Sequence, residues 1–458
     1  MLIRFNLENF LSFKDRTIFS MIPGKGTLKQ SHRVGSVKGI SALKTGLIFG
    51  ANASGKSNLI KAIGFGQGLL LRGTRVGQSI RFQKYRLNTA SVLSNSRLEY
   101  EIQHRGKNYA YGFVFNSKEI VEEWLFEVTS RSESIIFERN NANKEQFDIS
   151  SLLKKNKQAE HRQFLKFIAK GTPDNQLFLT EIRNRKVEEN VEDIVDLLNV
   201  IDWFQNVLKV ISPNDKYNEG IKSELKDDSK LQITYEELLT YFDTGINGIS
   251  LEMVEFESIE LPSGVMEKIK EDLLSSKSEN VRTVLSVSNT TYFISKLKDD
   301  LIVHKFMTRH NVVGQETSEL FDTKDESDGT NRIIDLIPLI IDLLEGGNVF
   351  VIDEMERSLH PNLIYDLLDL FLEKSHNVSS QLILASHESS LLTQKLLRKD
   401  EIWFVVKDDQ GVSSLHSLEE YNIRFDKEIR KDYLLGRFKA VPKMGNRNQL
   451  TVLPNQND

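Results

Sequence analysis

The first residues of the chain alternate between polar and apolar positions. Arg4 and Asn6 lie between apolar neighbours in residues 2–7, and Asn9 follows at the expected turn. This pattern predicts an edge strand that opens a hairpin. Residues 46–66 then predict an apolar strand, a glycine-rich loop and a helix with apolar positions on one side.

The rest of the chain falls into three differently patterned regions. Four alternating segments between residues 98 and 137 are rich in aromatic and β-branched side chains, which predicts an antiparallel sheet. Residues 150–280 carry apolar positions at helical spacing, without the sustained heptads of a long coiled coil, and predict a compact helical lobe. The last third repeats strand, turn and helix, which indicates a parallel sheet with crossover helices.

The composition is that of a globular protein. With 458 residues, 39% hydrophobic and 27% charged, the chain is expected to form two or three units. The net charge of -5 argues against a generally basic nucleic-acid binder but leaves a local patch open. The absence of cysteine excludes disulfides and thiolate metal sites and fits a cytoplasmic location. The longest apolar run, residues 333–344, is interrupted by Asp335 and Asp342, so we expect no membrane segment and no signal peptide.

Residues 50–57, GANASGKS, match the complete phosphate-loop pattern G-x-x-x-x-G-K-[ST] between a strand and a helix. The glycines let backbone N–H groups surround a polyphosphate, and the helix N-terminus adds positive potential. We expect Lys56 to reach the β- and γ-phosphates and Ser57 to bind Mg²⁺, whereas a chance glycine turn would lack this context. The expected nucleotide-binding residues here are Gly50, Ala51, Asn52, Ala53, Ser54, Gly55, Lys56, Ser57 and Asn58.

Two carboxylates follow the apolar strand NVFVIDE, residues 348–354. Parallel strands place ligand-binding groups at their C-terminal ends, so Asp353 is expected to hold Mg²⁺ through water. Glu354 is expected to polarise the attacking water as a general base. Alone, such a strand end is more often a surface loop, but together with the phosphate loop it indicates an NTPase.

Three more stretches refine this interpretation. ERSLHP, residues 356–361, follows the acid pair, and LILASHES ends a strand at His387, where a γ-phosphate contact is needed. A lone histidine at a strand end is otherwise usually structural. Ser327 and Gly329, within ESDGTNR, open the helix towards Leu344 and would present a hydroxyl and free N–H groups to an anion.

In this order, the motifs resemble those of the ABC-type ATPase heads of SMC, RecF and OLD proteins. LENFLSF near the N-terminus resembles the first strand and turn of RecF-like heads. YGFVF, EEWLFEV, IIFER and TPDNQLFL (residues 172–179) resemble prokaryotic AAA/ABC-like ATPases of the AbiLi and RloA kind, which are associated with phage defence. The resemblance covers nearly the whole chain and is loosest over residues 180–310.

The resemblance implies a head-to-tail homodimer, in which Ser327 and Gly329 of one copy close over the γ-phosphate bound by Lys56 of the other. The usual LSGGQ is ESDGT here, and Asp328 would oppose closure unless it points away or pairs with a cation such as Arg332. The glutamine that senses magnesium in such heads has one candidate, Gln83, with an ordinary exposed strand residue as the alternative.

The expected fold class is α/β: an ABC-type P-loop ATPase head, with a mixed sheet, an antiparallel β subdomain and an inserted, mainly helical lobe. Residues 1–150 and 281–420 are expected to form the two halves of the head. Residues 151–280 would form the helical lobe, and residues 421–458 a basic tail with a possible docking role.

The expected function is ATP binding and Mg²⁺-dependent hydrolysis by a regulatory subunit of an antiviral defence system. ATP is favoured because the chain lacks the Asn-Lys-x-Asp element that reads guanine. A separate effector, such as a nuclease, is expected because only 71 residues follow His387. One alternative is a DNA-repair ATPase, but such a protein would need a long coiled coil, which this sequence does not predict. The other is a transporter subunit, which is usually more compact than this chain. Basic side chains near the C-terminus and at residues 183–186 are either a solvated face or contacts for nucleic acid or an acidic partner.

Overall fold

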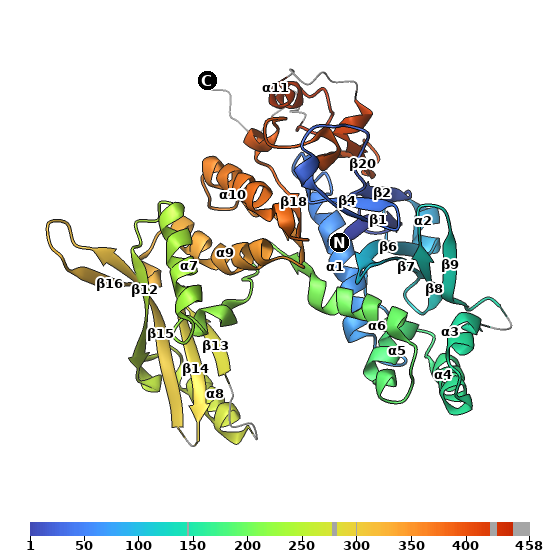
Figure 1. Cartoon of the computed structure of the whole chain (residues 1–458), viewed down its shortest axis with the longest axis horizontal. Helices are drawn as coiled ribbons and strands as arrows, with labels where there is room; N and C mark the ends of the chain where they lie inside the picture. The colour runs from blue at the N-terminus through green and yellow to red at the C-terminus, as the bar shows by residue number, and fades with distance from the viewer. Residues whose placement is uncertain (144–145, 277–281, 299, 422–427, 443–458) are drawn as a thin grey trace, which may run out of the picture. The chain divides into compact units, whose positions relative to one another are not determined.

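The computed structural model describes residues 1–458 except 144–145, 277–281, 299, 422–427 and 443–458. The chain divides into two compact units. The first unit comprises residues 1–210, 347–355 and 375–458, and the second comprises residues 211–346 and 356–374. Figure 1 shows the helices and strands of both units with their labels.

A seven-stranded antiparallel sheet forms one layer of the first unit, in the order β10-β9-β8-β7-β6-β1-β2 among the described residues. Its strands are β1 (Leu2–Glu8), β2 (Thr17–Ser20), β6 (Ser96–His104), β7 (Lys107–Phe115), β8 (Ile120–Val128), β9 (Glu133–Asn140) and β10 (Phe147–Asp148). The expected antiparallel sheet is therefore present. The expectation that β1 is an edge strand is wrong, because β1 pairs with both β6 and β2.

The second layer is a six-stranded sheet in the order β11-β17-β18-β5-β19-β20 among the described residues. Its strands are β5 (Thr45–Gly50), β11 (Leu208–Ile211), β17 (Val349–Asp353), β18 (Gln381–Ala385), β19 (Ile402–Lys407) and β20 (Ser413–Ser417). The pairs β17–β18, β18–β5 and β5–β19 are parallel, as the alternation of strands and helices predicts. The short strands β3 (Arg33–Val37) and β4 (Ile40–Leu43) form a separate ribbon.

Helix α1 (Lys56–Arg72) packs against both sheets through apolar side chains at helical spacing, including Leu59, Ile60 and Ile63. These side chains belong to a continuous apolar core that includes Tyr100 of β6, whose hydroxyl donates to the Ile63 carbonyl oxygen at 2.8 Å. The phosphate loop at the start of α1 is therefore fixed by the main core of the unit. The other helices of the unit are α2 (Thr89–Leu93), α3 (Ser150–Lys155), α4 (Ala159–Gly171), α5 (Phe178–Asn184), α6 (Val195–Asp202) and α11 (Ile429–Leu434).

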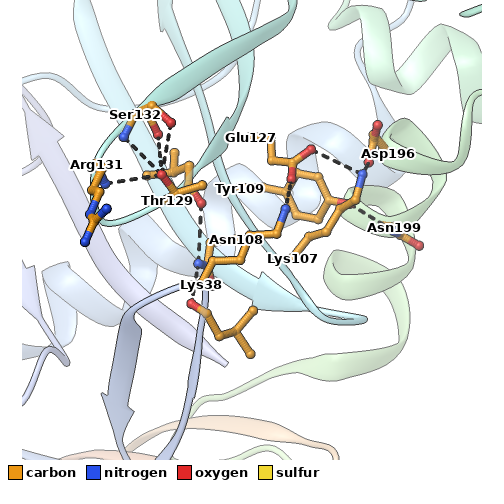
Figure 2. A network of polar contacts seen from close by, with 12 residues as sticks. Lys38, Lys107, Asn108, Tyr109, Glu127, Thr129, Arg131, Ser132, Asp196 and Asn199 are labelled. Carbon is orange, nitrogen blue, oxygen red and sulfur yellow. Dashed lines mark hydrogen bonds and ion pairs between the residues drawn. The ribbon is translucent and has the colours of Figure 1, made fainter.

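A buried carboxylate fastens α6 to the antiparallel sheet (Figure 2). Asp196 accepts hydrogen bonds from Lys107 Nζ at 2.6 Å and from the Tyr109 hydroxyl at 2.9 Å, and Asn199 donates to the same hydroxyl. Figure 2 shows Lys107 also next to Glu127, with which it forms an ion pair at 3.2 Å. These contacts hold the pKa of Asp196 below its ordinary value despite its burial. The sheet, rather than a separate lobe, therefore anchors residues 195–202.

The second unit contains an antiparallel sheet in the order β12-β15-β14-β13, with β16 paired to β15. Its strands are β12 (Gly248–Val254), β13 (Arg282–Val287), β14 (Thr290–Leu297), β15 (Asp300–Asn311) and β16 (Ser318–Asp322). Its helices are α7 (Ser229–Tyr241), α8 (Ser263–Ser275), α9 (Asp328–Glu345) and α10 (Pro361–Lys374). The division differs from the expected helical lobe at 151–280, because α3 to α6 belong to the first unit and β12 pairs with a strand about fifty residues later in the chain.

Candidate functional site

The phosphate loop connects β5, which ends at Gly50, to α1, which begins at Lys56. Gly55 between them has φ of 119°, in the region that favours glycine. A Cβ atom there would lie 2.4 Å from Ser413 Oγ and 2.8 Å from Ser12 Oγ. The loop therefore requires glycine at this position, both for its backbone conformation and for space.

The Lys56 side chain lies over the loop and is only 4% exposed. Its Nζ donates to the carbonyl oxygens of Gly50 at 2.8 Å and Ala51 at 3.3 Å, and it lies 3.4 Å from His387 Nδ1. An ammonium group held by neutral acceptors keeps its charge available for a phosphate. This geometry fits the expected role of Lys56.

Parallel pairing brings Asp353 to the same sheet edge as the phosphate loop. Asp353 is paired with Ala385, and Ala385 with Ile48 of β5, so the C-terminal ends of β17, β18 and β5 lie side by side. Asp353 is 4% exposed, and its carboxylate accepts a hydrogen bond from the Ser57 hydroxyl. Burial raises the pKa of Asp353 above its ordinary value, and the bond from Ser57 partly offsets this.

The Ser57–Asp353 pair has the chemistry of a magnesium site. Asp353 Oδ1 is buried and has no hydrogen-bond partner among the described residues. Hydroxyl and carboxylate oxygens are ligands that Mg²⁺ prefers, and sites that bind a metal–phosphate complex use only one or two such protein groups. The described residues contain no group of three or more histidines, cysteines or acids that could hold a metal. Ser57 and Asp353 therefore fit Mg²⁺ bound together with phosphate.

Glu354 and His387 face each other at the ends of neighbouring strands. Glu354 has φ of 52°, and its backbone N–H donates to the Ala385 carbonyl oxygen at 3.0 Å, which turns the chain at the end of β17. His387 Nε2 lies 3.8 Å from Glu354 Oε1. Burial and the nearby Lys56 ammonium lower the pKa of His387, so the imidazole is neutral near pH 7.

These side chains line one cavity of about 420 Å³. Its lining residues are Asn52, Ala53, Ser54, Gly55, Lys56, Ser57, Asn58, Glu354, His387 and Lys407. Gly50 and Ala51 contribute carbonyl oxygens that hold Lys56. The structure thus brings the expected phosphate loop, acid pair and histidine together within the first unit.

Lys407 is a site residue that sequence reasoning did not identify. Its Nζ donates to the Ala53 carbonyl oxygen at 3.1 Å and adds a second cation to the cavity. The available signal was its place at the end of β19, because β19 is parallel to β5 and ends at the same sheet edge.

Gln83, the expected magnesium sensor, is not among the residues that line this cavity. It is exposed and lies in an irregular segment rather than in a strand. Its backbone carbonyl oxygen accepts a hydrogen bond from Leu11 N at 2.8 Å. The structure therefore supports neither the metal role nor the alternative of a strand residue.

Ser327 and Gly329 lie in the second unit, at the start of α9. Ser327 is the N-cap residue, and its Oγ accepts a hydrogen bond from Thr330 N at 3.1 Å. A Cβ atom at Gly329 would lie 3.2 Å from the Ser358 carbonyl oxygen, in the SLHP segment. The helix start expected from the sequence is present, and Gly329 allows a close approach of two backbone segments.

The unusual acidic residues of this helix start have different environments. Glu326 Oε1 accepts from Thr308 Oγ1 at 2.5 Å and lies 2.7 Å from His310 Nε2, so β15 anchors it. Asp328 is exposed. Nε and Nη2 of Arg332 have no hydrogen-bond partner among the described residues, and burial lowers the pKa of its guanidinium. The condition that Asp328 pairs with Arg332 is therefore not met within the described chain.

The basic side chains near residues 183–186 and the C-terminus are partly paired within the chain. Arg185 pairs with Glu181 at 2.7 Å, and Arg437 pairs with Asp432 at 2.6 Å. Arg430 Nε donates to Ser389 Oγ at 3.3 Å. Two cations of the expected docking tail, Lys443 and Arg447, lie outside the described residues. These pairs are what a solvated charged face contains.

The fold and the cavity define a P-loop nucleotide-binding protein of the α/β class. Residues 47–393 match the family described as "AAA domain, putative AbiEii toxin, Type IV TA system". The chain belongs to this family of AAA domains, and the prediction of a prokaryotic AAA/ABC-type ATPase is confirmed. The α/β P-loop fold class is confirmed as well.

Similar solved structures include heads of SMC proteins. The SMC head domain from Thermotoga maritima is 12% identical, with a TM-score of 0.37, covering 91% of this chain and 98% of its own. An SmcHead bound to the C-winged helix domain of ScpA is 12% identical, with a TM-score of 0.38 and coverage of 91% and 97%. An Smc head with an extended coiled coil, bound to the C-terminal domain of ScpA derived from Pyrococcus furiosus, is 13% identical, with a TM-score of 0.33 and coverage of 96% and 99%. No curated protein matches the chain.

Proposed function

We propose that this chain binds ATP and hydrolyses it to ADP and phosphate with the help of Mg²⁺. The observation that carries the proposal is the convergence of Lys56, Ser57, Glu354 and His387 around one cavity of about 420 Å³. The buried Asp353 lies behind this lining, beside Ser57. These residues come from three distant parts of the sequence and bring the groups that phosphoryl transfer requires. Membership of an AAA family supports the same activity.

Each residue has a role that follows from its position. Lys56 and the N–H groups of residues 52–57 bind the β- and γ-phosphates, and Lys407 adds positive charge at the edge of the cavity. Ser57 and Asp353 hold Mg²⁺, which would neutralise phosphate charge when bound. Glu354 orients water and accepts its proton, and neutral His387, which lies 3.8 Å from Glu354, contacts the γ-phosphate.

We infer that two copies of the chain cooperate at each nucleotide. All residues that line the cavity belong to the first unit, while the Ser327 helix start lies in the second. The N-terminus of α9 carries a positive dipole end and an anchored hydroxyl, which suit the γ-phosphate of a nucleotide bound by a second copy. Asp328 would point away from that phosphate in the closed pair.

In the cell, we propose a cytoplasmic regulatory ATPase of an antiviral defence system, acting on a separate effector such as a nuclease. The family description, which names a toxin of a type IV toxin–antitoxin system, supports a role in such systems. No helix in the described part of the chain is long and apolar enough to span a membrane. Contact with nucleic acid is assigned to local basic patches, because the net charge is -5.

The experiment uses two variants that damage different halves of the composite site. Lys56→Ala removes the phosphate ligand in one copy, and Ser327→Arg blocks the helix start in the other. Mixing the two inactive variants should restore up to about one quarter of the wild-type ATPase activity, because half of the random dimers carry one intact composite site of two. Size-exclusion chromatography of tagged pairs confirms that mixed dimers form. No recovery in proven mixed dimers would contradict the two-copy site.

Glu354→Gln tests hydrolysis separately from binding. We expect ATP affinity to persist while turnover falls at least about 100-fold, since a general base contributes about 10² to 10⁴. ATP should then hold the variant as a dimer in light scattering. The matched control is Glu373→Gln, an exposed carboxylate on α10 that should leave turnover unchanged. Normal turnover by Glu354→Gln would show that Glu354 is not the general base.

A further inference from the structure

The sheet of the second unit has two differently covered faces. One face carries Tyr292, Ile294 and Val303, which pack with Met266 and Ile269 of α8. Figure 1 shows α8 near the end of the sheet where β14 turns into β15, and Lys296 Nζ donates to the Leu274 carbonyl oxygen at 2.6 Å. This face is therefore closed by an apolar contact with a helix.

The strand register defines the residues of the opposite face. Val284 of β13 pairs with Phe293 of β14, and Phe293 pairs with His304 of β15, so these three side chains form one row across the sheet. Arg282 and Ser295 form the next pair on the same face, two residues along. Phe293 is 6% exposed, so its ring is part of a covered floor.

Residues 220–227 form a wall beside this row and enclose a pocket of about 260 Å³. Lys226 Nζ donates to His304 Nε2 at 3.1 Å, which joins the wall to the floor. Burial and the Lys226 ammonium lower the pKa of His304, so it accepts this bond as a neutral imidazole. Ser223 and Asp227 of the wall and Leu251 and Arg282 of the sheet also line the pocket.

We propose that this pocket binds a small phosphorylated ligand of mononucleotide size. Arg282 and Lys226 are exposed cations on either side of the aromatic floor, and guanidinium and ammonium groups together are the usual donors to a phosphate. The half-buried Leu251 and Val284, above the buried Phe293 ring, offer the apolar surface that a planar base requires.

The remaining polar groups of the pocket favour a nucleotide over a bare anion. The Ser223 hydroxyl donates to the Gly220 carbonyl oxygen at 2.7 Å, so towards a ligand its oxygen can act only as an acceptor. Asp227 supplies a carboxylate, which accepts hydrogen bonds from sugar hydroxyl or amino groups. A nucleotide has one anionic group for Lys226 and Arg282, hydrogen-bond donors for Ser223 and Asp227, and a flat base for the apolar side chains.

The position of the pocket gives such a ligand a route to the start of α9. His304 lies on β15, and the same strand carries Thr308 and His310, whose side chains hold Glu326 next to Ser327. A ligand that orders β15 would therefore stabilise the anchored position of the helix start. Binding to the pocket is independent of the proposed ATPase, whereas this effect on turnover rests on it.

Isothermal titration of the full chain with AMP and with inorganic phosphate tests the site. We expect AMP to bind the wild type and Lys56→Ala equally, because AMP lacks the phosphates that the loop of the first unit holds. Lys226→Ala and Arg282→Ala should each weaken AMP about tenfold, the effect of one charge-assisted hydrogen bond. Lys268→Ala, which removes an exposed cation on α8, is the matched control and should bind AMP normally.

The outcomes separate this site from the phosphate loop. Loss of AMP binding in Lys56→Ala, with normal binding in Lys226→Ala and Arg282→Ala, would assign AMP to the first unit and overturn the proposal. Equal affinity for phosphate and AMP would overturn the nucleotide part, because base and sugar would then contribute nothing. Absence of heat with both probes would overturn the site. Circular dichroism establishes that each variant is folded, and Lys226→Ala, Arg282→Ala and Lys268→Ala should also retain ATP binding.

Discussion

The nucleotide cavity of the first unit and the helix start of the second unit are built in different ways. The cavity is assembled by parallel strands, which bring Asp353 and His387 to Lys56 from positions 297 and 331 residues later in the chain. The helix start is assembled locally, because Ser327 caps its own helix and Glu326 is held by the adjacent strand β15.

The two regions satisfy their polar groups in different ways. In the cavity, Lys56 is held by carbonyl oxygens and Ser57 by Asp353. When a nucleotide and a metal bind, they replace these internal partners of Lys56 and Ser57. At the helix start, the anchoring groups point into the second unit, and the helix N-terminus is fixed without a ligand. The first region is therefore adjustable, and the second is preorganised.

The strongest test of this comparison removes the cation of the adjustable region. Lys56→Ala should lower kcat/KM for ATP at least about 100-fold, because a positive charge next to a transferring phosphoryl group contributes on that scale. Lys61→Ala is the matched control, since Lys61 is an exposed lysine on the same helix and should keep normal turnover. A steady-state ATPase assay measures both variants. Normal turnover by Lys56→Ala would show that the cavity around Lys56 is not the ATPase site.

A smaller effect is expected from the titration of His387. Its pKa is held below the ordinary 6.5, so the imidazole is neutral at pH 7 and becomes charged only at lower pH. Protonation would place a second positive charge beside Lys56, and ATPase activity should fall as pH decreases below 6.5. His387→Gln should be about tenfold slower at pH 7 and lack this acid limb. If the activity of the variant still falls at low pH as in the wild type, another titrating group causes that fall.

The smallest effect concerns the packing of the preorganised region. Gly329→Ala places a Cβ about 3.2 Å from the Ser358 carbonyl oxygen and should destabilise the chain by about 1–2 kcal/mol. Gly264→Ala, on α8 with nothing within 4 Å of the added atom, should be neutral or slightly stabilising. Urea unfolding followed by circular dichroism compares the two variants. Equal unfolding midpoints would show that the close approach at Gly329 does not affect the free energy of unfolding.

Much of the site follows from short sequence patterns. The phosphate loop and the strand ending at Asp353 are local motifs, and their joint presence predicted that they meet at one sheet edge. Lys407 was missed because a lysine at a strand end is common. Only the parallel pairing of β19 with β5 shows that its side chain reaches the phosphate loop. Gln83 was expected either to sense magnesium or to lie exposed in a strand, but it lies in an irregular segment and is absent from the cavity lining.

Local sequence specifies the phosphate loop and the helix starts, since Gly55 and Ser327 act through backbone conformation and capping within a few residues. Which distant strands pair is settled only in the tertiary structure. It placed β1 inside its sheet, joined β12 to β15 in the second unit and attached α6 to the first. These choices depend on long-range hydrogen bonding and burial, which no local pattern encodes.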